Sequence, residues 1–124
     1  MKLDLLSLAE LPPEEAASCI ASFVEALASV DALYLMRHPK TPTLYKAGIT
    51  YSADEPWRDV PALLESRRGD CKSLVAWRIA ELRGRGYTAL VHVVYTAKLS
   101  EDLFHVQVRR NNKLEDPSRF LGMR

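Results

Sequence analysis

The sequence predicts one α+β domain in which helices precede antiparallel strands. Residues 12–38 and 70–85 carry apolar side chains at the three- and four-residue steps of a helix. Residues 87–97 and 103–110 are instead rich in β-branched and aromatic side chains, which favour strands. A chain of 124 residues is long enough for one buried core and short for two.

Composition narrows the functional classes. The chain has 17 basic and 16 acidic side chains and a net charge of +1, so no basic surface for nucleic acid is predicted. The apolar runs are short of the roughly 20 residues that cross a bilayer, and the N-terminus lacks a basic segment followed by an apolar one. We therefore expect a soluble protein without a secretion signal or a membrane partner, with free thiols at Cys19 and Cys71.

The first helix is predicted to begin at Pro12–Pro13, with Glu14 and Glu15 at the positive end of its dipole, and to end before Pro39. Cys19 would be a small residue beside its core-facing stripe. That stripe is expected to contain Ala16, Ile20, Phe23, Leu27, Val30 and Tyr34.

Residues 39–68 show no long periodic pattern. Four prolines, Gly48 and scattered aromatic residues indicate an ordered but irregular segment, of the kind that often forms a binding pocket. Within it, residues 59–66 (DVPALLES) favour a short helical turn leading to Gly69.

The second helix is predicted to start at Asp70 or Cys71, with Asp70 as its N-cap, and to run to about Arg85. A helix N-terminus lowers the pKa of a thiol, so Cys71 is a candidate nucleophile. Arg68-Gly69-Asp70 also spells a cell-adhesion tripeptide, but three common residues carry little information.

Two strands should follow. Residues 87–97 are apolar on both faces, which is typical of a central strand, whereas residues 103–110 alternate. The alternation puts Phe104, Val106 and Val108 on one face and His105 and Gln107 on the other.

Asn111–Asn112 is predicted to form a two-residue hairpin turn, because asparagine tolerates positive φ. Asp116 then shares a face with His105, diagonal to it and near enough for their side chains to meet. A three-residue loop would send Asp116 to the other face. The two-residue register pairs Arg110 with Lys113, Val108 with Glu115 and Gln107 with Asp116.

Cys71, His105 and Asp116 are the residue types of a nucleophile, its base and the carboxylate that orients the base. Each residue alone is more often structural. Together, on one inferred face, they favour a catalytic interpretation.

Three segments, GDCKSLVAWRIAELRGRGYTA, FHVQV and LEDPSRFLGM, together resemble the transglutaminase-like, papain-like cysteine proteins encoded in phages and prophages. LYKAGITYSADEPWRDVPALLESRRGDC is similar to the Gly, Tyr, Glu and Trp run that precedes their Gly-Asp-Cys. The resemblance covers residues 44–123. It implies a papain-like core in which a nucleophile-bearing helix packs on an antiparallel sheet, with residues 1–38 as an N-terminal helical segment, 39–68 irregular and 69–124 as the catalytic-type core.

The resemblance also implies roles. Cys71 would be the nucleophile, His105 the general base and acid, and Asp116 the orienting carboxylate. The backbone N–H of Cys71, with Trp57 as a tentative second donor, would form the oxyanion hole. Lys72 and Ser73 stand where many relatives carry acidic residues.

The reaction implied is acyl transfer on an amide or ester of a peptide, a protein or a small molecule, as in a cysteine protease, amidase or transglutaminase, without metal or cofactor. The expected setting is the host cytoplasm or a virion. Two alternatives stay open. One is a non-enzymatic assembly or binding module that contacts phage structural proteins. The other is a metal site at the three residues with His92, although His92 and His38 are more simply structural.

Overall fold

The computed structural model describes residues 11–98 and 101–124, and its α+β class agrees with the prediction. Residues 1–10 of the predicted N-terminal segment lie outside the described residues. In chain order the elements are α1 (Pro13–Arg37), the 3-10 turn η2 (Leu44–Lys46), β1 (Thr50–Tyr51), α2 (Val60–Ser66), β2 (Arg68–Gly69), α3 (Cys71–Gly84), β3 (Leu90–Lys98), β4 (Glu101–Arg110), β5 (Lys113–Glu115) and α4 (Pro117–Phe120).

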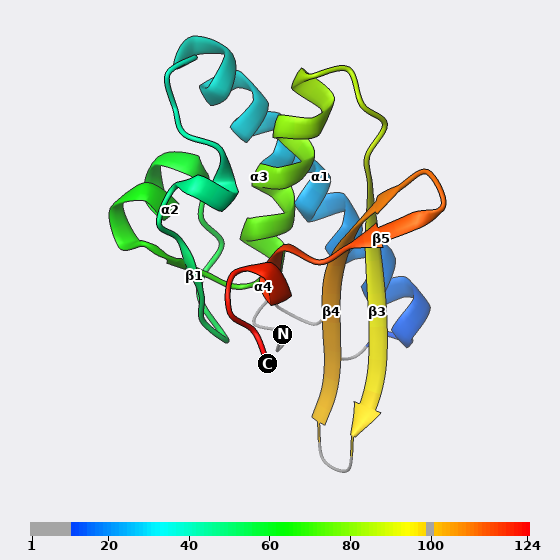
Figure 1. Cartoon of the computed structure of the whole chain (residues 1–124). Helices are drawn as coiled ribbons and strands as arrows, with labels where there is room; N and C mark the ends of the chain where they lie inside the picture. The colour runs from blue at the N-terminus through cyan, green and yellow to red at the C-terminus, as the bar shows by residue number, and fades with distance from the viewer. Residues whose placement is uncertain (1–10, 99–100) are drawn as a thin grey trace.

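Helix α3 is the centre of the molecule, with α1 on one side, the sheet on another, and the segment containing α2 and β1 on a third (Figure 1). Every α3 residue from Cys71 to Leu82 is buried except Arg78, which is half-buried. Gly69 allows this approach, because a Cβ there would lie 2.6 Å from Cδ2 of Leu63.

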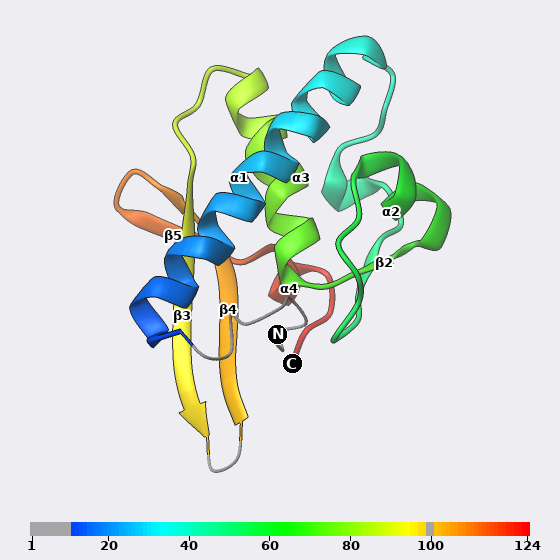
Figure 2. The ribbon, with the colours of Figure 1, turned by 180° about the vertical axis from the view of Figure 1, so that it is seen from behind.

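Helix α1 begins and ends where predicted, and Ala16 and Ile20 are buried as expected, but the buried face then departs from the predicted stripe. Its buried residues are Ala16, Ile20, Val24, Ala28 and Asp31. Phe23 and Val30, expected in the core, are 46% and 49% exposed. The helix carries apolar residues on two faces, and the face that packs against α3 and β3 (Figure 2) contains Val24, Ala28 and Asp31.

By length and composition α1 could also cross a membrane, with a mean hydropathy of 1.6 over 18 residues. The expectation from sequence rested on uninterrupted apolar runs, whereas the mean hydropathy is high because Glu25 and Asp31 are the only charged residues from Ala16 to Met36. Core helices of soluble proteins and signal sequences pass the same test, so the finding is weak evidence by itself.

The larger sheet has the strand order β3-β4-β5 and is antiparallel. The central strand is therefore β4, and the prediction that residues 87–97 form the central strand is wrong. The four residues from Val91 to Val94 are half-buried, because one face of this edge strand packs against α1 and the other is only partly covered. The presence of apolar residues on both faces of β3 did not distinguish a central strand from an edge strand.

The hairpin prediction is confirmed. Residues 111–112 form the turn, Asn111 has a φ of 54°, and Arg110 pairs with Lys113 and Val108 with Glu115. Phe104, Val106 and Val108 are buried, whereas His105 and Gln107 on the opposite face are half-buried.

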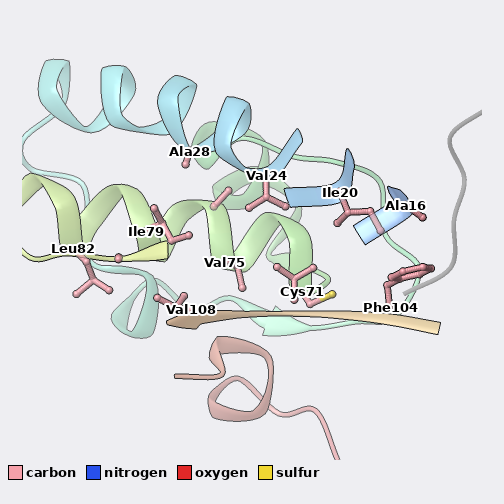
Figure 3. Close-up of a cluster of buried hydrophobic side chains, with 13 residues drawn as sticks. Ala16, Ile20, Val24, Ala28, Cys71, Val75, Ile79, Leu82, Phe104 and Val108 are labelled. Atoms are coloured by element: carbon pink, nitrogen blue, oxygen red, sulfur yellow. The ribbon is translucent and has the colours of Figure 1, made fainter. Parts of the chain in front are cut away.

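The buried side chains form two clusters. One lies between α1, α3 and β4 and includes Cys71 (Figure 3). The second lies beneath residues 39–68, where Leu44, Ile49 and Val60 pack on Leu74 and Trp77. The irregular segment is therefore an integral part of the core, and its predicted short helix is α2.

Candidate active site

His105 and Asp116 meet as the strand register predicts. Nε2 of His105 lies 2.8 Å from Oδ2 of Asp116, and the side-chain N–H of Gln107 donates to the same oxygen at 3.2 Å. Oδ1 of Asp116 accepts the backbone N–H of Arg119, so this carboxylate also caps α4. Asp116 is thus held from both the strand and the helix.

The charge state of Asp116 suits an orienting role. Burial raises its pKa, but the hydrogen bonds from His105 and Gln107 outweigh burial and hold the pKa below its ordinary value of 3.8. The carboxylate is therefore ionised at neutral pH. Because it occupies Nε2 of His105, a thiol would have to use Nδ1.

Cys71 is the first residue of α3, as predicted, but its thiol is not exposed. The residue is 1% exposed and lies among the apolar side chains between α3 and β4 (Figure 3). The Val106 N–H favours the thiolate, which places the sulfur beside the strand residue that follows His105. No hydrogen bond joins Cys71 to His105 among the interactions of the described residues.

The expected lowering of the thiol pKa is wrong for this conformation. Burial and the adjacent Asp70 carboxylate raise the pKa of Cys71 to about 11, and the favourable contribution of Val106 is smaller. The sequence showed the helix start but not the loss of water around it. In this state Cys71 is a protonated, shielded thiol.

Asp70 stands at the N-cap position, but its side chain does not cap the helix as expected. Its carboxylate instead forms a buried ion pair with Lys72. The Lys72 ammonium also donates to the carbonyl of Glu55 at 2.6 Å and lies 5.4 Å from the centre of the Trp57 ring. Lys72 therefore attaches residues 52–59 to the start of α3.

Ser73 makes a second attachment, because its hydroxyl oxygen accepts the backbone N–H of Arg58 at 2.9 Å. Lys72 and Ser73 thus both hold the 52–59 segment. Trp57 packs on the core beside the edge of Phe23, with ring centres 6.1 Å apart. These contacts favour a covering role, and its part in an oxyanion hole stays a prediction.

Tyr51 is a residue that sequence reasoning did not assign to the site. It pairs with Gly69 in the parallel β1–β2 ladder, and its N–H donates to the carbonyl of Leu121 after α4. Burial first, then the charges of groups that include Cys71 and Asp116, raises the pKa of its phenol. A two-residue ladder between distant segments leaves no periodic signal in the sequence.

Only the start of the segment predicted to form the pocket, residues 39–43, lines a hollow, and that hollow lies at the other end of α3 from Cys71. This hollow of about 810 Å³ lies between the C-terminal half of α1, residues 38–43 and the C-terminal end of α3, whereas Cys71 begins that helix.

No group of three metal-ligating side chains occurs among residues 11–98 and 101–124. Nδ1 of His92 accepts from Arg109, and His38 caps α1 against the carbonyl of Tyr34, which are structural roles.

No protein-family model, curated protein or solved structure matches this chain.

Proposed function

We propose that this protein is a thiol-dependent acyl-transfer enzyme of transglutaminase-like, papain-like type, with Cys71 as nucleophile, His105 as base and acid, and Asp116 as orienting carboxylate. The observation that carries the proposal is the 2.8 Å contact between His105 and Asp116 beside the α3 N-terminus. Gln107 and the α4 backbone fix the same carboxylate, a degree of support that an orienting group requires.

In the proposed reaction, Nδ1 of His105 takes the thiol proton and the Cys71 sulfur attacks the carbonyl carbon of an amide or ester. The backbone N–H of Cys71 donates to the developing oxyanion. His105 then protonates the leaving amine or alcohol as its bond to carbon breaks. Water or a second amine resolves the thioester, returning its proton through His105 to the Cys71 sulfur.

The buried thiol sets one requirement for this reaction. The substrate carbonyl must reach a sulfur that is 1% exposed, so the cover over the start of α3 has to open. The 52–59 segment is the part of that cover held by identifiable polar contacts, through Lys72 and Ser73. The catalytic state of the proposal therefore has Cys71 accessible and within reach of Nδ1 of His105.

The test is labelling of Cys71 by iodoacetamide between pH 5 and pH 10, in a Cys19→Ser background. We expect His105→Ala to slow labelling at pH 7 by about tenfold or more, because the thiol loses its base. Arg109→Ala, at an exposed residue on the same strand that does not contact Asp116, should change the rate by less than about threefold. Equal rates in the parent and His105→Ala would contradict the proposal, provided both show the same thermal unfolding.

Labelling alone does not demonstrate turnover. The second measurement is p-nitrophenyl acetate hydrolysis, in which an acyl-enzyme gives a burst of one p-nitrophenol per active Cys71. Cys71→Ser should abolish the burst. A reactive thiol without a burst would restrict the proposal to substrates larger than acetate, including peptides and proteins.

One observation favours a second candidate function, a non-enzymatic binding or assembly module that keeps this arrangement of residues. Cys71 has a raised pKa near 11 and packs as a small apolar side chain. If the thiol fails to label up to pH 10 in the folded protein, the module becomes the better interpretation. The partners implied by the resemblance are phage structural proteins, in a host cytoplasm or a virion.

A further inference from the structure

We propose that the outer face of α1 is a self-association surface on which two copies of this chain pack their α1 helices antiparallel. This inference is independent of the proposed function. Helix α1 contacts α3 and β3 through one face, and Figure 2 shows it lying on the outside of these elements. Its other face carries Val30 and Leu33, which are 49% and 51% exposed.

The exposed residues follow a symmetric pattern. We define the outer strip as seven residues of α1: Glu15, Cys19, Ser22, Ala26, Val30, Leu33 and Arg37. The steps between them are four, three, four, four, three and four residues. All are exposed except Cys19, which is half-buried. Steps of three and four place them along one side of a helix, and the order of the steps reads the same in both directions from Ala26.

A two-fold axis at Ala26 therefore brings each member of the outer strip opposite a complementary member of the second copy. Ser22 faces Val30, and Cys19 faces Leu33, so a small side chain meets a large one at each of these two levels. Ala26 faces Ala26, which lets the helix axes approach closely. The resulting contact is isologous and closes as a dimer.

Charge sets the antiparallel direction. Glu15 lies in the first turn of α1 and Arg37 in its last turn, and the same axis puts Glu15 of one copy opposite Arg37 of the other. Each dimer would contain this pair twice, at the two ends of the contact. A parallel arrangement would instead place like charges together and Leu33 against Leu33.

The contact uses one helix of 25 residues from each copy, which is at the small end of stable interfaces. We therefore expect reversible dimers with a Kd in roughly the micromolar range. The first test is sedimentation equilibrium of the full chain from about 1 µM to 500 µM. A protein that stays monomeric over this range overturns the proposal. If such a monomer also co-floats with phosphatidylcholine vesicles, the outer face of α1 binds lipid instead, and the proposal is again overturned.

A charge-swap series tests the geometry. Glu15→Arg and Arg37→Glu should each weaken the dimer by about fivefold or more, since each substitution puts like charges together at both ends. The double variant restores opposite charges and should return the Kd to within about twofold of the parent. Failure of the double variant to recover overturns the antiparallel register.

Cross-linking gives a matched control on the same helix. In a Cys19→Ser, Cys71→Ser background, Ala26→Cys places two thiols at the two-fold axis, where a mild oxidant should join the copies by a disulfide. Ala32→Cys adds an exposed thiol on α1 away from the outer strip and should remain largely uncross-linked. Equal cross-linking of both variants overturns the proposal.

Discussion

Glu115 and Asp116 are adjacent in the sequence, yet their carboxylates face different parts of the molecule. Glu115 is the last residue of β5 and opposes Val108, so its side chain turns toward α3. Asp116 follows on the other side of the chain, where it meets His105. The alternation of side chains along a strand accounts for the separation.

Their partners differ in kind. Glu115 accepts from Nε of Arg78 and from the hydroxyl of Tyr45, both at 2.5 Å, and from Arg110 at 3.1 Å. Burial raises its pKa, but these donors lower it below the ordinary value. Arginine keeps its charge at every accessible pH, so the group around Glu115 is a permanent ionic tie between η2, α3 and β5.

Asp116 accepts hydrogen bonds from an imidazole and an amide, and Nε of the exposed Arg119 lies 3.6 Å from its Oδ2. The hydrogen bond to the ionised carboxylate fixes the orientation of the His105 ring. Glu115 and Asp116 therefore have different roles, although the pKa of each carboxylate is lowered. The chemistry of the partner, more than the shift itself, separates a structural tie from a candidate catalytic pair.

The largest expected effect is at Glu115. We expect Glu115→Gln to lower the free energy of unfolding by about 3 kcal/mol, because the half-buried Arg78 and Arg110 keep their charges and lose the opposing one. Urea unfolding at pH 7 measures this loss. The exposed Glu65→Gln is the control and should change stability by less than about 0.5 kcal/mol. Equal effects would mean that the ionic tie contributes nothing.

A third carboxylate, Asp31, sharpens the comparison because it has no cationic partner among residues 11–98 and 101–124. Its Oδ1 accepts the N–H of Val60 at the start of α2, and burial raises its pKa from 3.8 to about 7. The folded protein then binds a proton that the unfolded chain releases. This contribution to stability is present below about pH 4 and is lost as the pH rises to about 7.

Between pH 5 and pH 8 we therefore expect the parent to lose about 2 kcal/mol more stability than Asp31→Asn, in which the side-chain oxygen still accepts from Val60. Thermal unfolding of both proteins at the two pH values measures the difference. Parallel pH profiles would show that Asp31 titrates alike in the folded and unfolded states.

At Asp116 we expect a small effect on stability and a large effect on the reactivity of the thiol. Asp116→Asn should cost about 1 kcal/mol of stability, since an amide oxygen can replace one acceptor. Under the proposed function it should slow Cys71 labelling at pH 7 by about tenfold or more, because His105 loses its orienting charge. If Glu115→Gln slows labelling equally once stability is matched, the distinction between the two carboxylates fails.

The smallest effect is expected at Tyr45. Burial, then the contact with Glu115, raises the pKa of the Tyr45 phenol, which therefore stays a donor. Tyr45→Phe removes one hydrogen bond and keeps the ring packed on Phe120, so we expect a loss of about 1 kcal/mol or less. Tyr87→Phe, at an exposed tyrosine, is the matched control. A loss of more than about 2 kcal/mol would mean that the arginines depend on the hydroxyl.

The accuracy of the sequence predictions follows the range of the interactions involved. The meeting of His105 with Asp116 depended on a two-residue turn and on side-chain alternation, which act over about ten residues. The buried face of α1 and the place of β3 at the sheet edge depended on contacts between distant segments. Because α1 and β3 each carry apolar residues on two faces, their patterns did not determine the buried face of α1 or the position of β3 in the sheet.

The sequence by itself determined the ends of α1 and α3, the inward face of β4 and the partner of His105, because prolines, glycines and periodic patterns act locally. Tertiary structure decided the state of Cys71. The thiol pKa depends on how much water remains around the sulfur, and residues from α3, β4 and the 52–59 segment exclude that water together. No local pattern contains that information, because the segments meet only when the chain is folded.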